Sequence, residues 1–308
     1  MKTVVFLLSF SLLITACSPA QKSPQQAKDS VPAQLLHRHY YDHMPEYTFF
    51  GLDSSIPPDS ITSLTLDLIT LANGFPAQVY TFRNLHTLYF EGVSENVRLD
   101  ERILQLTKLR HVTFKGRLEK VAVSYDSTLA LICRLPSLET LELQSLLELP
   151  FVFPPGSHLR QMFISGCGKK VTDAFIRMKG LENLKELEML SILQSCMANL
   201  PDGIFEMEKL RYLNLSMNLF PRAEENSMPH TFRIGAIPPT INNLVDLEEL
   251  ILDQAGVKSM SIDPKRLTKL KKIKLSGNCY GQKTHDQLKK DFPDAGIWNY
   301  VELPSICE

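Results

Sequence analysis

The chain has 308 residues, of which 44% are hydrophobic and 22% charged, and its 33 lysines and arginines nearly balance its 34 aspartates and glutamates. This composition is typical of a globular protein of one large domain or two small ones, and it excludes collagen-like, low-complexity and wholly disordered chains. It lacks the basic excess that nucleic-acid-binding proteins carry, so we expect no nucleic-acid partner.

The first sixteen residues have the features of an export signal. Lys2 gives a short positive start, and residues 4–14 are apolar except for Ser9 and Ser11. A helix of this length rises only about 16 Å, well short of the roughly 30 Å hydrocarbon core of a bilayer. We therefore expect residues 1–16 to be a cleaved signal peptide and not a membrane span.

The residues at the end of this signal are Ile14-Thr15-Ala16-Cys17. They resemble the lipobox of bacterial lipoproteins, in which the signal is removed before an obligatory cysteine that then carries the lipid. The resemblance implies lipidation of Cys17 and a membrane anchor in the cell envelope. Because Ser18 follows the cysteine in place of an aspartate, it implies the outer membrane, with the domain facing either the periplasm or the medium. The alternative is an ordinary secretory cleavage site near which Cys17 happens to fall.

Residues 17–33 consist mainly of Ser, Pro, Gln and Ala and have almost no apolar content. Such a segment cannot bury enough surface to offset the entropy of ordering, so we expect a flexible tether that begins at the lipidated Cys17. Residues 34–60 contain several aromatic residues and three histidines, of which His39 and His43 are four residues apart. Histidines at this spacing can hold a metal on a helix. We favour an N-terminal cap here, and we expect neither a metal nor a cofactor.

From residue 61 onward the pattern L-x-x-L-x-L recurs nine times, at intervals of 21 to 37 residues. In most repeats a further apolar residue stands three positions before the opening one. Nine matches in register are a strong signal, although any single match is weak. The matches are Ile61/Leu64/Leu66, Leu85/Leu88/Phe90, Leu109/Val112/Phe114, Leu138/Leu141/Leu143, Leu159/Met162/Ile164, Leu184/Leu187/Met189, Leu210/Leu213/Leu215, Leu247/Leu250/Leu252 and Leu270/Ile273/Leu275.

This pattern resembles the leucine-rich repeat family over about residues 61–290. In that family each L-x-x-L-x-L is a short parallel strand whose leucines point inward, and a helical, 3-10 or irregular segment returns the chain. The resemblance implies an α/β solenoid, a curved horseshoe of about nine repeats with a concave parallel sheet, and we expect a C-terminal cap over residues 291–308. One repeat cannot bury its apolar face alone, so stacked repeats must share a single core.

The sequence also departs from the family pattern. The family places Asn or Cys three positions beyond the last inward residue of the strand, where the buried side chain bonds the turn. Here only Cys167, Asn218 and Asn278 fit, so we expect irregular loops at residues 67–81 and 115–134. The longest interval contains an insertion at residues 219–236, which could be functional or merely tolerated.

Five cysteines remain after Cys17, an odd number for an exported chain. Cys279 and Cys307 bracket the C-terminal end, where they could form a disulfide that closes the cap or stay as two free thiols. The sequence contains no C-x-x-C motif, so it gives no support to a zinc site.

Six cations lie within residues 265–274, which suggests an anionic partner. The repeat register favours a different explanation. Lys271 and Lys272 stand at the strand positions that Glu248 and Glu249 hold one repeat earlier. Because adjacent strands lie about 4.8 Å apart, we expect these two pairs to neutralise each other laterally.

The side chains between the inward leucines line the concave face, so they are the candidates for binding. Exposed Tyr and Phe are typical of protein hot spots, although scattered surface aromatics also occur without a function. We expect Tyr89, Phe163 and Tyr212 to contribute most. The full set of expected contact residues is Tyr89, His111, Glu142, Phe163, Glu188, Tyr212 and Asn214.

The sequence lacks G-x-S-x-G, H-E-x-x-H, G-x-G-x-x-G and P-loop motifs, so we expect no catalytic residues. We interpret the chain as a non-enzymatic envelope lipoprotein that binds a protein partner through the concave face. A glycan or polysaccharide receptor is the alternative, because exposed aromatics also stack on sugars. The least favoured alternative is an enzyme whose site lies in residues 219–236.

Overall fold

The computed structural model describes residues 48–49, 57–67, 75–93, 99–116, 126–145, 152–166, 179–195, 200–218, 234–278 and 280–298. The chain divides into two compact units, Met1–Met44 and Pro45–Glu308, and all described residues belong to the second. The expected signal peptide, Cys17, the tether, His39, His43, most of the insertion, Cys167, Cys279 and Cys307 lie outside the described residues.

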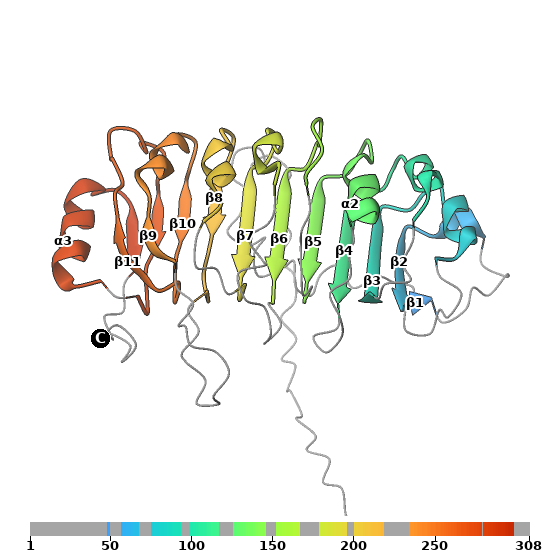
Figure 1. Ribbon diagram of the computed structural model, residues 1–308, viewed down its shortest axis with the longest axis horizontal. Coiled ribbons are helices and arrows are strands. Elements are labelled where there is room, and N and C mark those ends of the chain that lie inside the picture. The colour runs from blue at the N-terminus through green and yellow to red at the C-terminus, as the bar shows by residue number, and fades with distance from the viewer. Residues whose placement is uncertain are drawn as a thin grey trace, which may run out of the picture. The chain divides into compact units, whose positions relative to one another are not determined.

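A single parallel sheet of eleven strands runs through the second unit (Figure 1). Nine of its strands, β2–β8, β10 and β12, correspond to the nine sequence matches, and β1 and β13 extend the sheet at its two ends. The strands are β1 (Thr48–Phe49), β2 (Ser63–Asp67), β3 (Thr87–Val93), β4 (His111–Gly116), β5 (Thr140–Gln144), β6 (Gln161–Ser165), β7 (Met189–Leu193), β8 (Tyr212–Asn214), β10 (Glu249–Ile251), β12 (Lys272–Lys274) and β13 (Gly296–Trp298).

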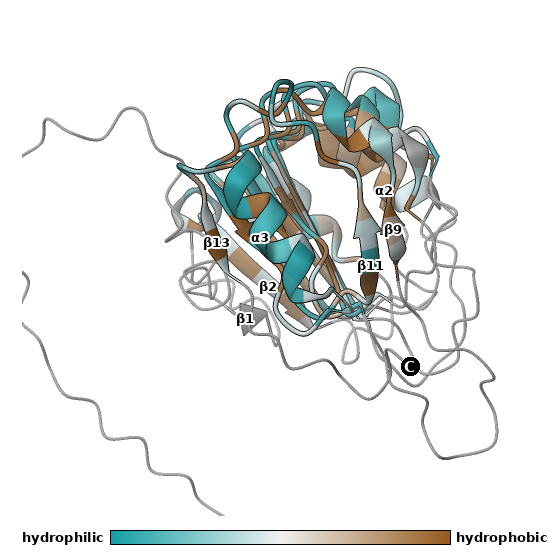
Figure 2. Cartoon of the chain, turned by 90° about the vertical axis from the view of Figure 1, so that its left-hand side faces the viewer, coloured by the Kyte–Doolittle hydropathy of each residue, from teal (hydrophilic) through white to brown (hydrophobic). Residues whose placement is uncertain are grey.

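The segments that return the chain between strands are mostly short 3-10 helices, and they lie on the side of the core opposite the large sheet (Figure 2). A second, two-stranded parallel sheet formed by β9 (Gly235–Ile237) and β11 (Val257–Met260) lies on the same side. The helical segments are η1 (Pro58–Ser60), η2 (Ala77–Thr81), η3 (Glu101–Gln105), α2 (Asp126–Cys133), η5 (Leu181–Asn183), η6 (Asp202–Glu206), η7 (Pro239–Asn243) and α3 (Gln282–Asp291). None of the described helices is long and apolar enough to cross a membrane.

The core lies between the large sheet and the return segments. Successive side chains of a strand point to opposite faces, so the repeated apolar residues all enter the core. Leu88, Leu141, Leu213 and Leu250, for example, are fully buried in four repeats spread along the sheet. Each repeat therefore completes its core only by stacking on its neighbours, which is the packing that the periodicity predicts.

Strand β7 has a different register from the predicted one. Leu190 pairs with Met162 and Ile192 with Ile164, so the inward residues are Leu187, Leu190 and Ile192. The prediction of Leu184/Leu187/Met189 placed this strand three residues too early. Apolar residues recur here every third position, from Leu181 to Leu190, so the sequence fits two registers equally well.

The sheet continues past residue 290, where we expected the repeats to end, because β13 pairs with β12. Helix α3 lies between these two strands in the sequence and covers the C-terminal end of the stack (Figures 1 and 2). It is mostly hydrophilic and buries Leu288. Phe292, just after the helix, is also buried, so both residues close the apolar core at this end.

A buried asparagine links consecutive repeats where each strand turns away from the sheet. Asn218 Nδ2 donates to the carbonyls of Ile192 and Leu215, both at 2.8 Å, and its Oδ1 accepts from Ser195 N at 2.8 Å. With the corrected register, Ser195 itself stands at the equivalent position of the preceding repeat and is fully buried. The expected role of Asn218 in bonding the turn is confirmed.

Asn278 makes the same kind of link sixty residues later. Its Nδ2 donates to the carbonyls of Leu252 and Leu275, at 2.6 and 2.8 Å. Its Oδ1 accepts from Ala255 N and Val257 N, at 3.2 and 3.0 Å. One buried amide thus bonds four backbone groups, of which Ala255 N and Leu252 O also bond each other at 3.2 Å.

The same turn requires a left-handed residue two positions after the last inward residue of the strand. Glycine adopts this conformation without strain, whereas a residue with a Cβ does so at a cost. Three of these positions hold glycine and four do not. They are Gly92, Ser145, Gly166, Gln194, Met217, Gln254 and Gly277, with φ between 49° and 78°.

Candidate functional site

The outward-facing side chains of the large sheet form two main rows across its concave face. The pairing register assigns each row directly, and it places four of the expected contact residues, Tyr89, Glu142, Phe163 and Asn214, in the middle row. The middle row is Thr65, Tyr89, Thr113, Glu142, Phe163, Ser191, Asn214, Ile251, Lys274 and Trp298. The first row, two residues earlier on each strand, is Ser63, Thr87, His111, Thr140, Gln161, Met189, Tyr212, Glu249, Lys272 and Gly296.

Glu188 does not belong to the middle row, where the prediction placed it. Ser191 holds that position, and Glu188 stands just before β7. The reason is the three-residue error in the register of this strand. The Glu188 carboxylate pairs instead with Arg160, with Nη2 and Oε1 2.5 Å apart.

Half-buried polar side chains form bonded pairs on the concave face of β3–β5. Thr113 Oγ1 donates to Glu142 Oε2 at 3.2 Å, and Gln144 Nε2 donates to Glu142 Oε1 at 2.5 Å. Lys115 Nζ lies 2.9 Å from Glu91 Oε1. These contacts hold the polar side chains of this region in place.

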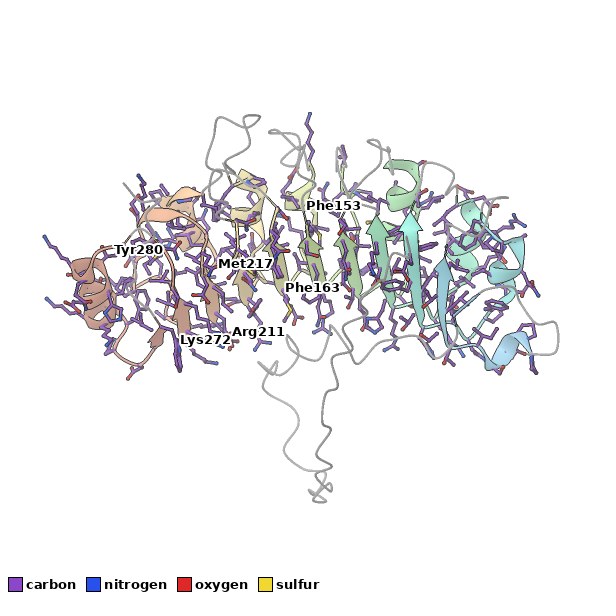
Figure 3. The ribbon with its side chains drawn as sticks, turned by 90° about the horizontal axis from the view of Figure 1, so that it is seen from below. Phe153, Phe163, Arg211, Met217, Lys272 and Tyr280 are labelled. Carbon is purple, nitrogen blue, oxygen red and sulfur yellow. The ribbon has the colours of Figure 1, made fainter. Side chains whose placement is uncertain are left out.

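The two aromatic candidates of this region flank that network. Tyr89 lies on β3 and Phe163 on β6, and both are half-buried. Three strand spacings separate them, which is about 14 Å. Burial raises the pKa of Tyr89, and the nearby Lys115 partly offsets this. Figure 3 shows Phe163 on the same side of the ribbon as Lys272, away from Phe153 and the return segments.

Tyr212 and Asn214 lie on the concave face by register but are buried, with exposed fractions of 5% and 8%. Asn214 Nδ2 donates to the Tyr212 hydroxyl at 3.4 Å, and Asn214 Oδ1 accepts from Ser216 N at 3.0 Å. Burial raises the pKa of Tyr212 well above its ordinary value. The expectation that Tyr212 is an exposed aromatic is therefore wrong. Its neighbours in the row are the buried Met189 and the half-buried Glu249.

From β4 to β12 of the large sheet, the residue just before each strand is charged with alternating sign, and ion pairs between these residues connect several neighbouring repeats. Glu248 lies between two cations, 2.6 Å from Arg211 Nη2 and 2.7 Å from Lys271 Nζ. Burial alone would raise the pKa of Glu248, but hydrogen bonds from Lys271 and Arg211 outweigh it and hold this pKa below its ordinary value. The other pairs of this row are Arg110–Glu139 and Arg160–Glu188.

Three of the six cations in the basic run pair with carboxylates, and two of these pairs are those that the register predicts. Lys271 pairs with Glu248, and Lys272 Nζ lies 3.0 Å from Glu249 Oε2. Lys269 also pairs with an acid of the preceding repeat, Asp246, at 2.5 Å. These cations therefore stabilise the stacking of repeats, and they do not form a free basic patch.

Trp298 is a surface residue of the concave face that sequence reasoning missed. It pairs in register with Lys274 at the end of the middle row, and its exposed fraction is 55%. The repeat pattern gives no sign of β13, because Asp294 and Asn299 replace two of the three apolar positions around Ile297. The only available signal was that Trp298 is the single tryptophan of the chain.

Groups with catalytic or metal-binding chemistry are few in the part of the chain that the structure describes. That part holds no cluster of three or more His, Cys, Asp or Glu residues that could bind a metal ion. Its free cysteine, Cys133, is buried, and burial raises the pKa of the thiol to about 12. The thiolate is the nucleophilic form, so Cys133 is an inert core residue.

Stacked parallel strands, inward leucines, short return segments and linking asparagines together define one architecture. The fold is a leucine-rich repeat solenoid. The leucine-rich repeat domain of the type III effector XopL has the same fold, with a TM-score of 0.51 at 18% sequence identity over 79% of this chain and 77% of that one. Listeria monocytogenes InlP aligns with a TM-score of 0.47 at 16% identity, over 79% of this chain and 61% of that one.

Comparison of sequences finds one further similarity. The chain is 28% identical over 260 residues to the volume-regulated anion channel subunit LRRC8D of Rattus norvegicus. The match covers 79% of this chain and 26% of that protein, so the chain spans about a quarter of its length. No protein-family model matches the chain. At 18% identity the similarity to the XopL domain shows the fold alone.

Proposed function

We propose that this protein is a non-enzymatic, lipid-anchored envelope protein that binds a protein partner through the concave face of its solenoid. One observation carries the proposal. Strands β3–β6 present both aromatic and polar half-buried side chains on the concave face. The aromatic rings of Tyr89 and Phe163 lie on either side of the hydrogen-bonded Thr113–Glu142 pair. Aromatic anchors among fixed polar groups are typical of protein interfaces.

The spacing of the aromatics supports a protein over a glycan. A sugar-binding surface would gather its aromatic rings into one patch, where they stack on adjacent rings of the ligand. Here polar side chains of two intervening strands separate Tyr89 from Phe163. An interface of mixed chemistry over several strands fits the side chains of a folded protein better.

The membrane anchor is the second part of the proposal, and it rests on the sequence Ile14-Thr15-Ala16-Cys17. Two or more acyl chains at Cys17 would hold the protein stably at a bilayer, whereas one chain binds only marginally. Mass spectrometry of the mature N-terminal peptide tests this directly. We expect a lipidated Cys17, and Cys17→Ser should leave the protein soluble after cell fractionation. A mature N-terminal peptide that begins after residue 17 and carries no lipid would contradict the anchor.

Affinity capture from an envelope extract tests the binding site. The bait is the full-length protein, and the Tyr89→Ala/Phe163→Ala double variant should lose a partner that the unsubstituted protein retains. The matched control is Val152→Ala/Val245→Ala, which removes two exposed apolar side chains outside the large sheet, with exposed fractions of 58% and 44%. Equal capture by all three proteins would move the site away from β3–β6. Absence of any captured protein would contradict a protein partner.

A further inference from the structure

Trp298 and Lys274 lie side by side at the C-terminal end of the concave face. They pair in register on β13 and β12, and adjacent strands of a sheet are about 4.8 Å apart. Trp298 is exposed, and Lys274 is half-buried. Gly296, at the first-row position of the same strand, has no side chain, and the indole lies close to it, since a Cβ there would be 3.2 Å from Trp298 Nε1.

Lys274 differs from the other cations of this sheet. Among the described residues, each other lysine or arginine on a strand of the large sheet, or just before one, has a carboxylate partner in a neighbouring repeat. These paired cations are Arg110, Lys115, Arg160, Arg211, Lys271 and Lys272. Lys274 has neither an ion pair nor a side-chain hydrogen bond to any described residue. Within the described part of the chain, its ammonium group therefore has no anionic partner.

The chemistry of the two side chains defines what they can bind. The lysine ammonium and the indole N–H donate hydrogen bonds and accept none, and the indole adds a broad apolar surface. The carboxylates of Glu249 and Asp253 already contact other groups of the protein, because Glu249 Oε2 pairs with Lys272 and Asp253 Oδ1 accepts from Ser276 N at 2.7 Å. A sugar hydroxyl both donates and accepts, so it would be only half satisfied here. A carboxylate beside an apolar group matches both parts of the site.

We propose that Trp298 and Lys274 bind an acidic, apolar segment of a protein partner. Lys274 pairs with an aspartate or glutamate of that segment, and Trp298 covers the apolar side chain next to it. This inference rests on the proposed protein-binding function and adds a second contact site on the same face, on β12 and β13, which are four and five strands beyond β6 in the sheet. The charge of the site specifies the partner: it must carry a negative charge there.

Fluorescence of the single tryptophan provides a direct test, because Trp298 is its only source. The probe is an acetylated and amidated hexapeptide of alternating aspartate and leucine, titrated into the full-length protein. We expect the emission of Trp298 to shift to shorter wavelength as leucine covers the indole. Lys274→Ala should weaken binding about tenfold, and Lys274→Arg should retain it. The matched control is Lys258→Ala, an exposed lysine on strand β11 of the other sheet.

Three results would overturn the inference. Equal affinity of Lys274→Ala and the unsubstituted protein would remove Lys274 from the site. Equal affinity for a hexapeptide of alternating asparagine and leucine would show that charge is not recognised. A shift caused by phosphatidylglycerol vesicles and not by the peptide would assign the pair to a membrane surface. Circular dichroism of each variant confirms that it is folded.

The same variants separate this inference from the proposed function. If the full-length protein captures a partner and Trp298→Ala captures it equally well, this inference fails while the proposed function stands. If no protein is captured but the acidic peptide binds in a Lys274-dependent manner, the proposed function fails and the chemistry of the site is supported.

Discussion

The repeats near the two ends of the sheet are stabilised by different groups at equivalent positions. In β3 and β4 the last inward residues are Phe90 and Phe114, whose rings stack with centroids 4.6 Å apart and an interplanar angle of 8°. In the C-terminal repeats leucines occupy those positions, and Asn218 and Asn278 bond the turns that follow. The same repeat geometry is thus stabilised by packed aromatic rings near the N-terminal end of the sheet and by buried asparagine amides near the C-terminal end.

This comparison predicts a large, local effect of removing an aromatic ring at the N-terminal end. Phe114→Ala should lower the free energy of unfolding by about 4 kcal/mol, because it leaves a cavity against Phe90 in a fully packed core. Denaturant titration gives the magnitude. Hydrogen exchange should accelerate mainly in β3–β5, since each repeat contacts only its neighbours. Equal acceleration in β12 would show instead that the solenoid opens as one unit.

The complementary change at the other end is Asn278→Ala. It removes the amide's hydrogen bonds to four backbone groups of two repeats, of which Ala255 N and Leu252 O keep only a bond to each other at 3.2 Å, so we expect a loss of about 3 kcal/mol. Exchange should now accelerate in β10 and β12 and not in β3. The control is Asn243→Ala, an exposed asparagine that accepts a single hydrogen bond from Arg266. A loss as small as that of the control would contradict the role of the amide in linking repeats.

Much of this fold could be predicted from the sequence because its signal is periodic. The nine matches located nine strands of the large sheet, and the positions of Asn218 and Asn278 predicted their role in the turns. Periodicity fails where apolar residues also fill the intermediate positions. The three-residue spacing from Leu181 to Leu190 allowed two registers, and the wrong one moved Glu188 into the binding row.

The candidate site was less predictable than the fold. Alternation along a strand assigns a side chain to the concave face, but it does not say how exposed that side chain is. Tyr89 and Phe163 are half-buried, whereas Tyr212 at a comparable position is buried. Trp298 was missed because its strand, β13, lacks the leucine pattern. This strand is the last one of the sheet and has a neighbour on one side only.

The left-handed turns give a prediction of intermediate size. Gly277→Ala should cost about 1.5 kcal/mol, because φ is +68° and the new Cβ would lie 2.9 Å from Gln254 Cγ. Gly235→Ala is the matched control, with φ of +71° and nothing within 4 Å of its Cβ. It should cost less, since only the backbone strain remains. Thermal unfolding of both variants measures the difference, and equal losses would mean that Gln254 moves aside freely.

The smallest predicted effect concerns the ion pairs between repeats. The pKa of Glu248 is lower in the folded protein than its ordinary value of 4.5, so Glu248 stabilises the fold above that pH. This contribution should disappear as the pH falls below about 4.5 and the carboxylate is protonated. We expect it to be less than about 1 kcal/mol, as for other partly exposed pairs.

Denaturant titration between pH 3 and pH 7 checks this for Glu248→Gln. The variant should be less stable than the unsubstituted protein at pH 7, and the two should converge toward acid pH, because both then lack the charge. Glu206→Gln is the matched control, an exposed glutamate whose side chain makes no ion pair with any described residue. If Glu248→Gln matches that control at every pH, the alternating pairs contribute nothing to stacking, and the core and the asparagine amides alone hold the C-terminal repeats together.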